Sequence, residues 1–254
     1  MDLKGKVTVV TGGASGIGLA MAKLFAAKGS KIVVADVKGH DEAAAEIKAA
    51  GGEAAGFACD VRDENHMVAL MKFAVDTFGG VDVAILNAGI LRDGLLLKYD
   101  KETRKVAGKM ALKQWQDVID VNLTGVFLSG REAAATMVDG GRKGVIIMLS
   151  SISKAGNFGQ TNYSATKAGV VAMMVAWSRE LARFGIRVAA IAPGFIETPM
   201  VMKDMKPEAL EAFKKTIPIG RLGKPEEIAQ TAAYIVECDL VTGVCVEATG
   251  GIRL

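Results

Sequence analysis

Short runs of β-branched and other apolar residues alternate along this chain with longer segments whose apolar residues recur at helical spacing. After the run at 6–10, a glycine-rich turn opens a helix in which Ile17, Met21 and Phe25 share one face, and Gly29 ends it. The same rhythm predicts further strands at 31–35, 54–59, 81–86, 144–149, 186–192 and 244–247, and further helices at 41–50, 64–78, 112–138, 162–184 and 225–236.

Strands that are separated by helices run parallel, because right-handed crossovers place the helices on both faces of one buried sheet. The pattern therefore predicts an α/β fold of the Rossmann type, with a doubly wound, seven-stranded parallel sheet flanked by helices on both faces. At 254 residues the chain is long enough for a sizeable core, and we expect residues 1–254 to form a single domain.

Two segments interrupt the alternation, and both follow the ends of strands, where open parallel sheets bind their ligands. Residues 95–110 are rich in charge and suggest a small exposed hairpin turning near residues 100–103, either a solvated insertion or a contributor to substrate access or subunit contact. Residues 194–220 mix apolar and charged positions, which predicts a short helical lid for the substrate or, alternatively, a helix packed permanently on the core.

Charge and composition exclude several classes of function. The formal net charge of +3 comes from residues spread along the chain, so we expect no nucleic-acid partner. No apolar run approaches the ~20 residues that span a bilayer, and the N-terminus lacks a signal-peptide pattern, so a cytoplasmic location without membrane association is expected. The cysteines Cys59, Cys238 and Cys245 are far from CxxC spacing, and His40 and His66 lie in polar stretches, so we expect no metal site.

The turn between the first strand and the first helix predicts a dinucleotide site. In Thr11-Gly-Gly-Ala-Ser-Gly-Ile-Gly18 the glycines allow a pyrophosphate to approach the backbone N–H groups at the helix N-terminus. Asp36 ends the second strand, where a carboxylate can accept both ribose hydroxyls of NAD and repels the 2′-phosphate of NADP. We therefore expect NAD as cofactor, although the neighbouring Lys38 can soften the discrimination.

Motifs along the whole chain resemble those of the short-chain dehydrogenase/reductase family in order and spacing. The resemblance implies a cofactor site in which Asp60 and Val61 contact the adenine and Thr198 holds the nicotinamide carboxamide, and a catalytic set of Asn122, Ser150, Tyr163 and Lys167. The matching motifs are the phosphate loop with Gly12, Ser15, Gly16, Ile17 and Gly18; Asp60-Val61; Asn87-Ala88-Gly89; Val121-Asn122; Ser150; Tyr163-Ser-Ala-Thr-Lys167; and Pro193-Gly194 with Thr198.

The chemistry expected at this set is proton transfer coupled to hydride transfer. A tyrosine phenol has an ordinary pKa of about 10, so it serves as a base only when nearby positive charge stabilises the phenolate. Lys167 is four residues after Tyr163 on a predicted helix, which stacks the two side chains on one face.

The hydroxyl that donates to the substrate oxygen is expected from the end of the fifth strand. Ser150 lies 13 residues before Tyr163, and Ser151 is the rival, which strand alternation is expected to point elsewhere. Asn122 is an awkward residue inside a long helix, so a bent helix or a bound water is expected there, and the family likeness implies a water in a proton relay beside the lysine.

The leading hypothesis is thus an NAD-dependent dehydrogenase of a ketone or secondary alcohol, which the family resemblance implies is a homotetramer. The alternative is a 3-oxoacyl-[acyl-carrier-protein] or acyl-CoA reductase, whose acidic carrier could dock on basic residues of the second irregular segment if these are not merely a solvated face: Lys203, Lys206, Lys214, Lys215 and Arg221. A catalytically silent NAD-binding sensor or scaffold is disfavoured by the complete catalytic set, and a nucleotide-sugar epimerase by the short C-terminal part and the glycine spacing.

Overall fold

The computed structural model describes residues 1–198, 211 and 214–254. Seven parallel strands form one sheet in the order β3-β2-β1-β4-β7-β8-β9, so the order reverses between β1 and β4. This confirms the predicted doubly wound sheet, with strand ends that differ from the expected ones by at most two residues. The strands are β1 (Val7–Thr11), β2 (Lys31–Asp36), β3 (Glu53–Ala58), β4 (Val83–Leu86), β7 (Val145–Leu149), β8 (Arg187–Pro193) and β9 (Cys245–Ala248).

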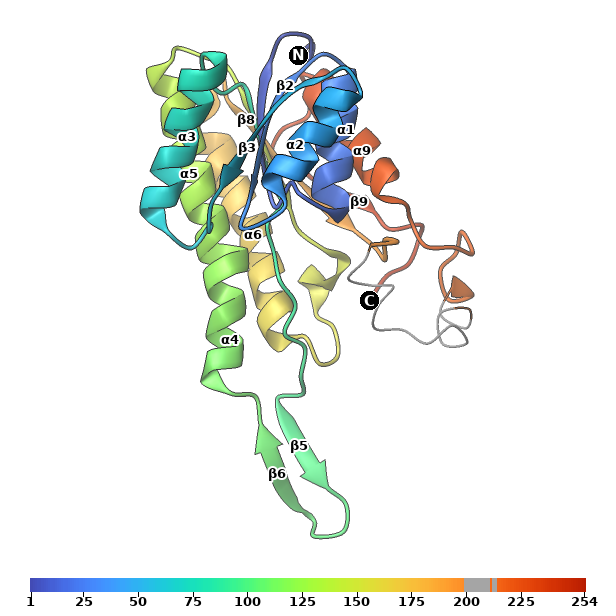
Figure 1. The fold of residues 1–254 in the computed structure, drawn as a ribbon. Helices are drawn as coiled ribbons and strands as arrows, with labels where there is room; N and C mark the ends of the chain where they lie inside the picture. Colours follow the sequence, from blue (N-terminus) through green and yellow to red (C-terminus); the bar gives the residue numbers. More distant parts are fainter. Residues whose placement is uncertain (199–210, 212–213) are drawn as a thin grey trace.

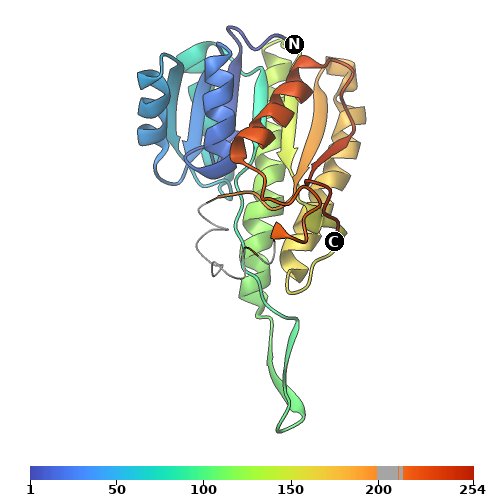
Figure 2. The ribbon, with the colours of Figure 1, turned by 90° about the vertical axis from the view of Figure 1, so that its right-hand side faces the viewer.

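Helices cover both faces of the sheet (Figures 1 and 2). One face packs against α1 (Gly16–Ala27), α2 (His40–Ala49) and α9 (Pro225–Glu237). The other packs against α3 (Glu64–Phe78), α5 (Gly125–Asp139) and α6 (Thr161–Glu180). Because successive side chains of a strand point to opposite faces, each buried strand contributes to both apolar layers, and the central strands are mostly apolar.

The two longest predicted helices are each interrupted. The expected helix at 112–138 consists of α4 (Leu112–Ile119), a π-helical turn η1 (Asp120–Thr124) and α5, in line with the expected bend at Asn122. The expected helix at 162–184 ends as α6 at Glu180 and continues as the 3₁₀ turn η3 (Ala182–Phe184), which closes at Gly185 in the left-handed region, φ 72°.

The hairpin expected within residues 95–110 is present. Strands β5 (Leu97–Asp100) and β6 (Lys105–Lys109) pair antiparallel as a separate two-stranded sheet. Their turn is held by the carboxylate of Asp100, whose Oδ1 accepts from the backbone N–H groups of Glu102 (2.8 Å) and Thr103 (3.1 Å). In Figures 1 and 2 the hairpin extends below the body of the molecule, beyond the N-terminal end of α4.

The lid expected at 194–220 lies largely outside the described residues, since 199–210, 212 and 213 are among those not described. Its ends are fixed: Ile196 forms a parallel bridge with Gly223, and Ile217 and Leu222 form a small apolar cluster with Phe195 and Ile252. The lid stays a prediction. Across the part of the chain that is described, no helix combines the length and the apolar character needed to cross a membrane.

Candidate active site

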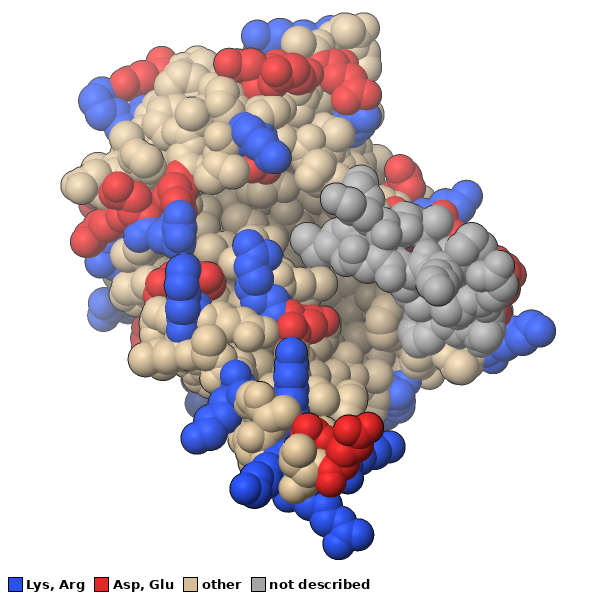
Figure 3. Space-filling model, turned by 60° about the horizontal axis from the view of Figure 1, so that its bottom comes forward, with Lys and Arg blue, Asp and Glu red and all other residues tan. Residues whose placement is uncertain are grey.

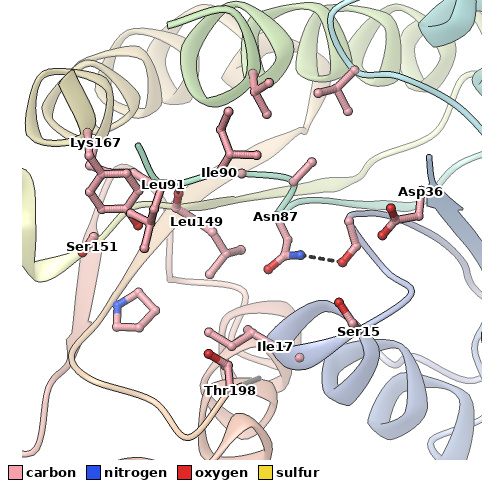
Figure 4. Close-up of a pocket in the computed structure, with 18 of the residues that line it drawn as sticks. Ser15, Ile17, Asp36, Asn87, Ile90, Leu91, Leu149, Ser151, Lys167 and Thr198 are labelled. Atoms are coloured by element: carbon pink, nitrogen blue, oxygen red, sulfur yellow. Dashed lines mark hydrogen bonds between the residues drawn. The ribbon is translucent and has the colours of Figure 1, made fainter. Parts of the chain in front are cut away.

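A cleft of about 600 Å³ lies at the carboxyl ends of the parallel strands, where the strand order reverses. Figure 4 shows Asp36 at one end of it and Ser151 and Lys167 at the other, with Asn87 and Ile90 between them. Ligands bind at this position in open α/β sheets. Sixteen of the eighteen site residues expected from the sequence line the cleft: Gly12, Ser15, Gly16, Ile17, Asp36, Asp60, Val61, Asn87, Ala88, Gly89, Ser150, Tyr163, Lys167, Pro193, Gly194 and Thr198.

The glycine turn fits a phosphate because side chains are excluded from it. Gly12 has φ 62°, and a Cβ there would come within 2.8 Å of the Cα of Ala88. Gly18 does not line the cleft, but its lack of a side chain lets the first turn of α1 approach the carbonyl oxygen of Gly12, which a Cβ would overlap. The Asn87 side chain fixes the turn, with Nδ2 donating to the carbonyl oxygens of Gly12 (2.8 Å) and Thr11 (3.2 Å).

Thr198 lies beside this turn. Its Cγ2 would be 3.6 Å from a Cβ on Gly16, which has φ 53°. The glycine turn and Thr198 therefore enclose the N-terminus of α1, a site suited to an anionic group.

Two carboxylates stand at the far end of the cleft. Asp36 follows the buried part of β2, and its Oδ2 accepts from the backbone N–H of Ala14 at 3.2 Å. Asp60 forms a bidentate pair with Arg62, 2.5 Å at the shortest, and this pairing lowers the pKa of Asp60. Asp36 has no such cationic partner among the described residues, so its carboxylate is free to accept from hydroxyl groups.

The structure reverses the expected orientation of the two serines at the end of β7. Ser150 follows strand alternation onto the face covered by α6, where its Oγ donates to the carbonyl oxygen of Lys167 at 2.8 Å. Ser151 lies just beyond the strand, caps the 3₁₀ turn η2 (Ile152–Ala155), and faces Tyr163, whose pKa it lowers. The expectation that Ser151 points elsewhere is wrong, because alternation holds only while the strand continues.

Burial controls the protonation of Tyr163 and Lys167. Desolvation raises the pKa of Tyr163 to about 12; the hydrogen bond from Ser151 opposes this rise, and the charge of Asp93 adds to it. Desolvation lowers the pKa of Lys167 to about 8. The Lys167 Nζ donates to the carbonyl oxygen of Leu149 at 2.6 Å and lies 5.4 Å from the centre of the Tyr163 ring. A cation or an anion bound beside them would therefore change the pKa values of both groups strongly.

Asn122 lies behind the cleft and does not line it. It is fully buried in the π-helical turn, where its Oδ1 accepts from the N–H of Ile90 (2.8 Å) and its Nδ2 donates to the carbonyl oxygen of Ile90 (2.9 Å). The side chain thus holds the chain segment that follows β4 against the helix, and π-helical turns of this kind are frequent at functional sites.

Sequence reasoning missed a group of polar residues at the rim beside Tyr163. The side chain of Gln160, which caps α6, donates to Asp93 Oδ2 (2.8 Å) and accepts from Ser153 Oγ (2.9 Å) and Asn157 Nδ2 (2.9 Å). The position of Gln160 at the start of a helix is visible in the sequence, but its partner Asp93 is 67 residues away. Only the fold brings the two together.

Comparisons with known proteins agree with this geometry. The model of the short chain dehydrogenase family matches residues 6–209. A 3-oxoacyl-[acyl-carrier-protein] reductase, FabG, of Thermotoga maritima is 39% identical, covering 99% of each chain. The 3beta-hydroxysteroid dehydrogenase 1 of Eggerthella lenta is 40% identical over 100% of this chain and 95% of its own, and a 2,5-dichloro-2,5-cyclohexadiene-1,4-diol dehydrogenase of Sphingobium indicum is 37% identical over 98% of each.

Proposed function

The chain belongs to the short-chain dehydrogenase family of oxidoreductases, and we propose that within it this protein transfers a hydride between NAD(H) and a ketone or secondary alcohol. The observation that carries the proposal is one cleft with Tyr163, Ser151 and the buried Lys167 at one end and the Asp36 carboxylate at the other. A nicotinamide dinucleotide bound along the cleft would have its nicotinamide beside Tyr163 and Lys167 and its adenosine ribose beside Asp36.

The residues of the cleft fit a dinucleotide. The glycine turn presents bare backbone at the N-terminus of α1 for the pyrophosphate, and Asp36 offers a carboxylate for the ribose hydroxyls. Asp60, Val61 and Thr198 also line the cleft, and we assign Asp60 and Val61 to the adenine and Thr198 to the nicotinamide carboxamide. The nicotinamide supplies the hydride or accepts it. We favour NAD over NADP because a 2′-phosphate beside Asp36 would meet like charge.

Tyr163 is proposed as the general acid in ketone reduction and the general base in alcohol oxidation. Its pKa is high in the cofactor-free protein because of burial, so the phenolate requires added positive charge nearby. The Lys167 ammonium supplies such charge from the same helix face. Burial lowers the pKa of Lys167, and the negative charge of a neighbouring phenolate or substrate oxyanion would raise it again and favour the ammonium form.

We assign the substrate-orienting hydroxyl to Ser151 in place of Ser150. The Ser151 hydroxyl faces Tyr163, so it can donate to an oxygen that Tyr163 protonates. The Ser150 hydroxyl is committed to the backbone of α6 and supports the position of Lys167. Asn122 is proposed to hold the segment after β4 in place and to support the water relay beside Lys167.

A homotetramer remains our proposal for the assembly. Apolar side chains stand exposed on the outer helices, with Phe127 41%, Leu112 78% and Tyr234 54% exposed. Exposed apolar surface of this kind marks contacts between subunits.

A second candidate is reduction of a 3-oxoacyl thioester. It is favoured by the likeness over nearly the whole chain to 3-oxoacyl-[acyl-carrier-protein] reductases, including the one of Vibrio cholerae, 36% identical over 100% of each chain. Both candidates use the same catalytic set, so they differ in what binds beside Ile90, Leu91 and Arg92 at the mouth of the cleft.

The test is turnover of a panel of ketones, secondary alcohols and 3-oxoacyl thioesters with NAD(H) and NADP(H) in separate assays. Wild type is compared with Tyr163→Phe and with Tyr234→Phe, which removes an equivalent hydroxyl from the exposed face of α9. We expect turnover with NAD(H) that collapses only in Tyr163→Phe. Preference for NADP(H) would refute the role of Asp36, and binding of NADH without any turnover would favour a silent sensor.

A further inference from the structure

The β5–β6 hairpin folds without support from either apolar core. Its turn is closed by Asp100, its strands pair from Leu97 opposite Lys109 to Asp100 opposite Lys105, and the N–H of Met110 donates to the carbonyl oxygen of Leu96 at 3.0 Å. None of its residues belongs to the buried clusters of the described chain. A two-stranded hairpin alone is only marginally stable in water, so a surface that covers it would stabilise it.

One face of the hairpin carries three exposed apolar side chains together with Lys109, which is opposite Leu97. Leu97 is 51% exposed, and the opposed pair Tyr99 and Val106 are 62% and 50% exposed. The other face carries Lys98 and Lys105, with Asp100 opposite Lys105. This combination of an uncovered apolar strip and a basic face is typical of a surface that binds another molecule.

The hairpin also holds the whole net charge of the protein. Residues 97–109 contain five basic and two acidic residues, which leaves 26 basic and 26 acidic residues in the rest of the chain. Figure 3 views this end of the molecule and shows lysine and arginine side chains around the projecting hairpin. The basic residues are Lys98, Lys101, Arg104, Lys105 and Lys109.

The base of the hairpin is fastened to the catalytic elements. The carbonyl oxygen of Arg92 accepts from the side chains of Gln114 on α4 (2.9 Å) and Asn162 on α6 (2.9 Å). The N–H of Gly94 donates to the carbonyl oxygen of Gly159 at 2.8 Å. Asn162 directly precedes Tyr163, and Arg92 lines the mouth of the cleft. The base of the hairpin is therefore fixed relative to the entrance of the active site, and a partner that binds the hairpin would lie close to that entrance.

We propose that the β5–β6 hairpin is a docking arm for an acidic carrier protein that presents the substrate as a thioester at the mouth of the cleft. The inference rests on the second candidate function and names the partner of that same site. Charge favours an acidic partner over a second copy of this chain. The arm has a net positive charge, whereas in a second copy the rest of the chain has no net charge and the arm is also positive. The apolar strip of Leu97, Tyr99 and Val106 would form the centre of the contact, and the lysines would steer association.

The experiment measures binding of purified phosphopantetheinylated acyl carrier protein to the full-length protein by calorimetry at low and at high salt. Lys98→Glu/Lys105→Glu reverses two charges on the arm. Its matched control is Lys48→Glu/Lys143→Glu, which makes the same change in net charge at exposed positions on α2 and on the loop before β7. A third variant, Leu97→Ser/Tyr99→Ser, removes the apolar strip and leaves the charge unchanged.

We expect the arm reversal to weaken the Kd for the carrier by at least about tenfold at low salt, to flatten its salt dependence, and to leave kcat/KM for a small diffusible ketone within about twofold of wild type. The control variant should bind like wild type. Equal carrier binding by wild type and arm variant, or no binding by wild type, would overturn the proposal. A change of oligomeric state in Leu97→Ser/Tyr99→Ser would also overturn it, because the arm would then bind a second copy of the chain. Binding to anionic lipid vesicles that depends on the arm, without binding to the carrier, would overturn it as well. Ketone turnover reports separately on the proposed function.

Discussion

The two neighbouring serines at the end of β7 allow the same substitution, serine to alanine, to be made at a hydroxyl that faces Tyr163 and at one that contacts the backbone of α6. Ser151→Ala removes the hydroxyl that faces Tyr163. Removing one such donor at a reacting oxygen typically lowers kcat by about 10²–10³, equivalent to about 3–4 kcal/mol of transition-state stabilisation. We expect a loss of that size for Ser151→Ala, with KM changed far less, because the donor acts mainly on charge that develops in the reaction.

Ser150→Ala removes a different kind of interaction. Its Oγ donates to the carbonyl oxygen of Lys167 at 2.8 Å, inside α6, where that carbonyl also has a helical partner four residues later. The carbonyl is therefore not left unsatisfied, and the expected cost is the net value of one buried hydrogen bond, about 1 kcal/mol of unfolding free energy. For a domain of this size that lowers Tm by about 2–4 °C.

The assay combines steady-state kinetics, followed by nicotinamide absorbance, with thermal unfolding of both variants and of wild type. The expected pattern is a kinetic loss with near-normal Tm for Ser151→Ala and a small loss of Tm with near-normal kcat for Ser150→Ala. The assignment of roles is wrong if Ser150→Ala loses two orders of magnitude in kcat while Ser151→Ala stays active.

Three further outcomes are expected. Asp36→Asn should lower the preference for NAD over NADP, measured as the ratio of kcat/KM values, by at least about tenfold, whereas Asp76→Asn on α3 should leave it unchanged; an unchanged ratio in Asp36→Asn would contradict the role given to that carboxylate. Gly18→Ala places a methyl group on the carbonyl oxygen of Gly12, so NADH binding, followed by fluorescence, should weaken by at least about tenfold or Tm should fall; normal values of both would show that the turn can relax. Burial lowers the pKa of Lys167 from 10.5 to about 8, so between these values the unfolded chain holds more protons than the folded one, and stability rises with pH. From pH 8 to pH 10, the unfolding free energy of wild type should therefore rise relative to Lys167→Met by about 2 kcal/mol, and a constant difference in urea unfolding would contradict this.

The fold followed from periodicity because burial on both faces leaves each central strand as an apolar run. Residues 145–149 and 187–193 are buried or nearly so along their whole length, which made them easy to recognise. The glycine turn and Asp36 were equally visible, since both depend on their position relative to the first two strands. Helical spacing indicated that Tyr163 and Lys167 share one face of a helix, but their catalytic role was expected from their place after the fifth strand and from the family resemblance.

What the sequence left open depends on contacts between distant segments. Ser150 and Ser151 could not be separated, because the strand ends at Leu149 and the backbone then turns into η2. The hydrogen bond between Gln160 and Asp93 joins residues that no local pattern connects. The bend at Asn122 was expected, but its π-helical form was not, because the apolar positions on either side of Asn122 continue at helical spacing.

That turn also sets the rotational phase between the two helices it joins. The N–H of Gly125 donates to the carbonyl oxygen of Asp120, five residues back, so η1 holds one residue more than a regular α-helical turn. An α-helix advances about 100° per residue. Deleting one residue there would rotate α5 by about that angle against α4 and turn the buried Ala133 and Met137 away from the sheet. The helix therefore cannot lose a residue at this turn without displacing part of the apolar core.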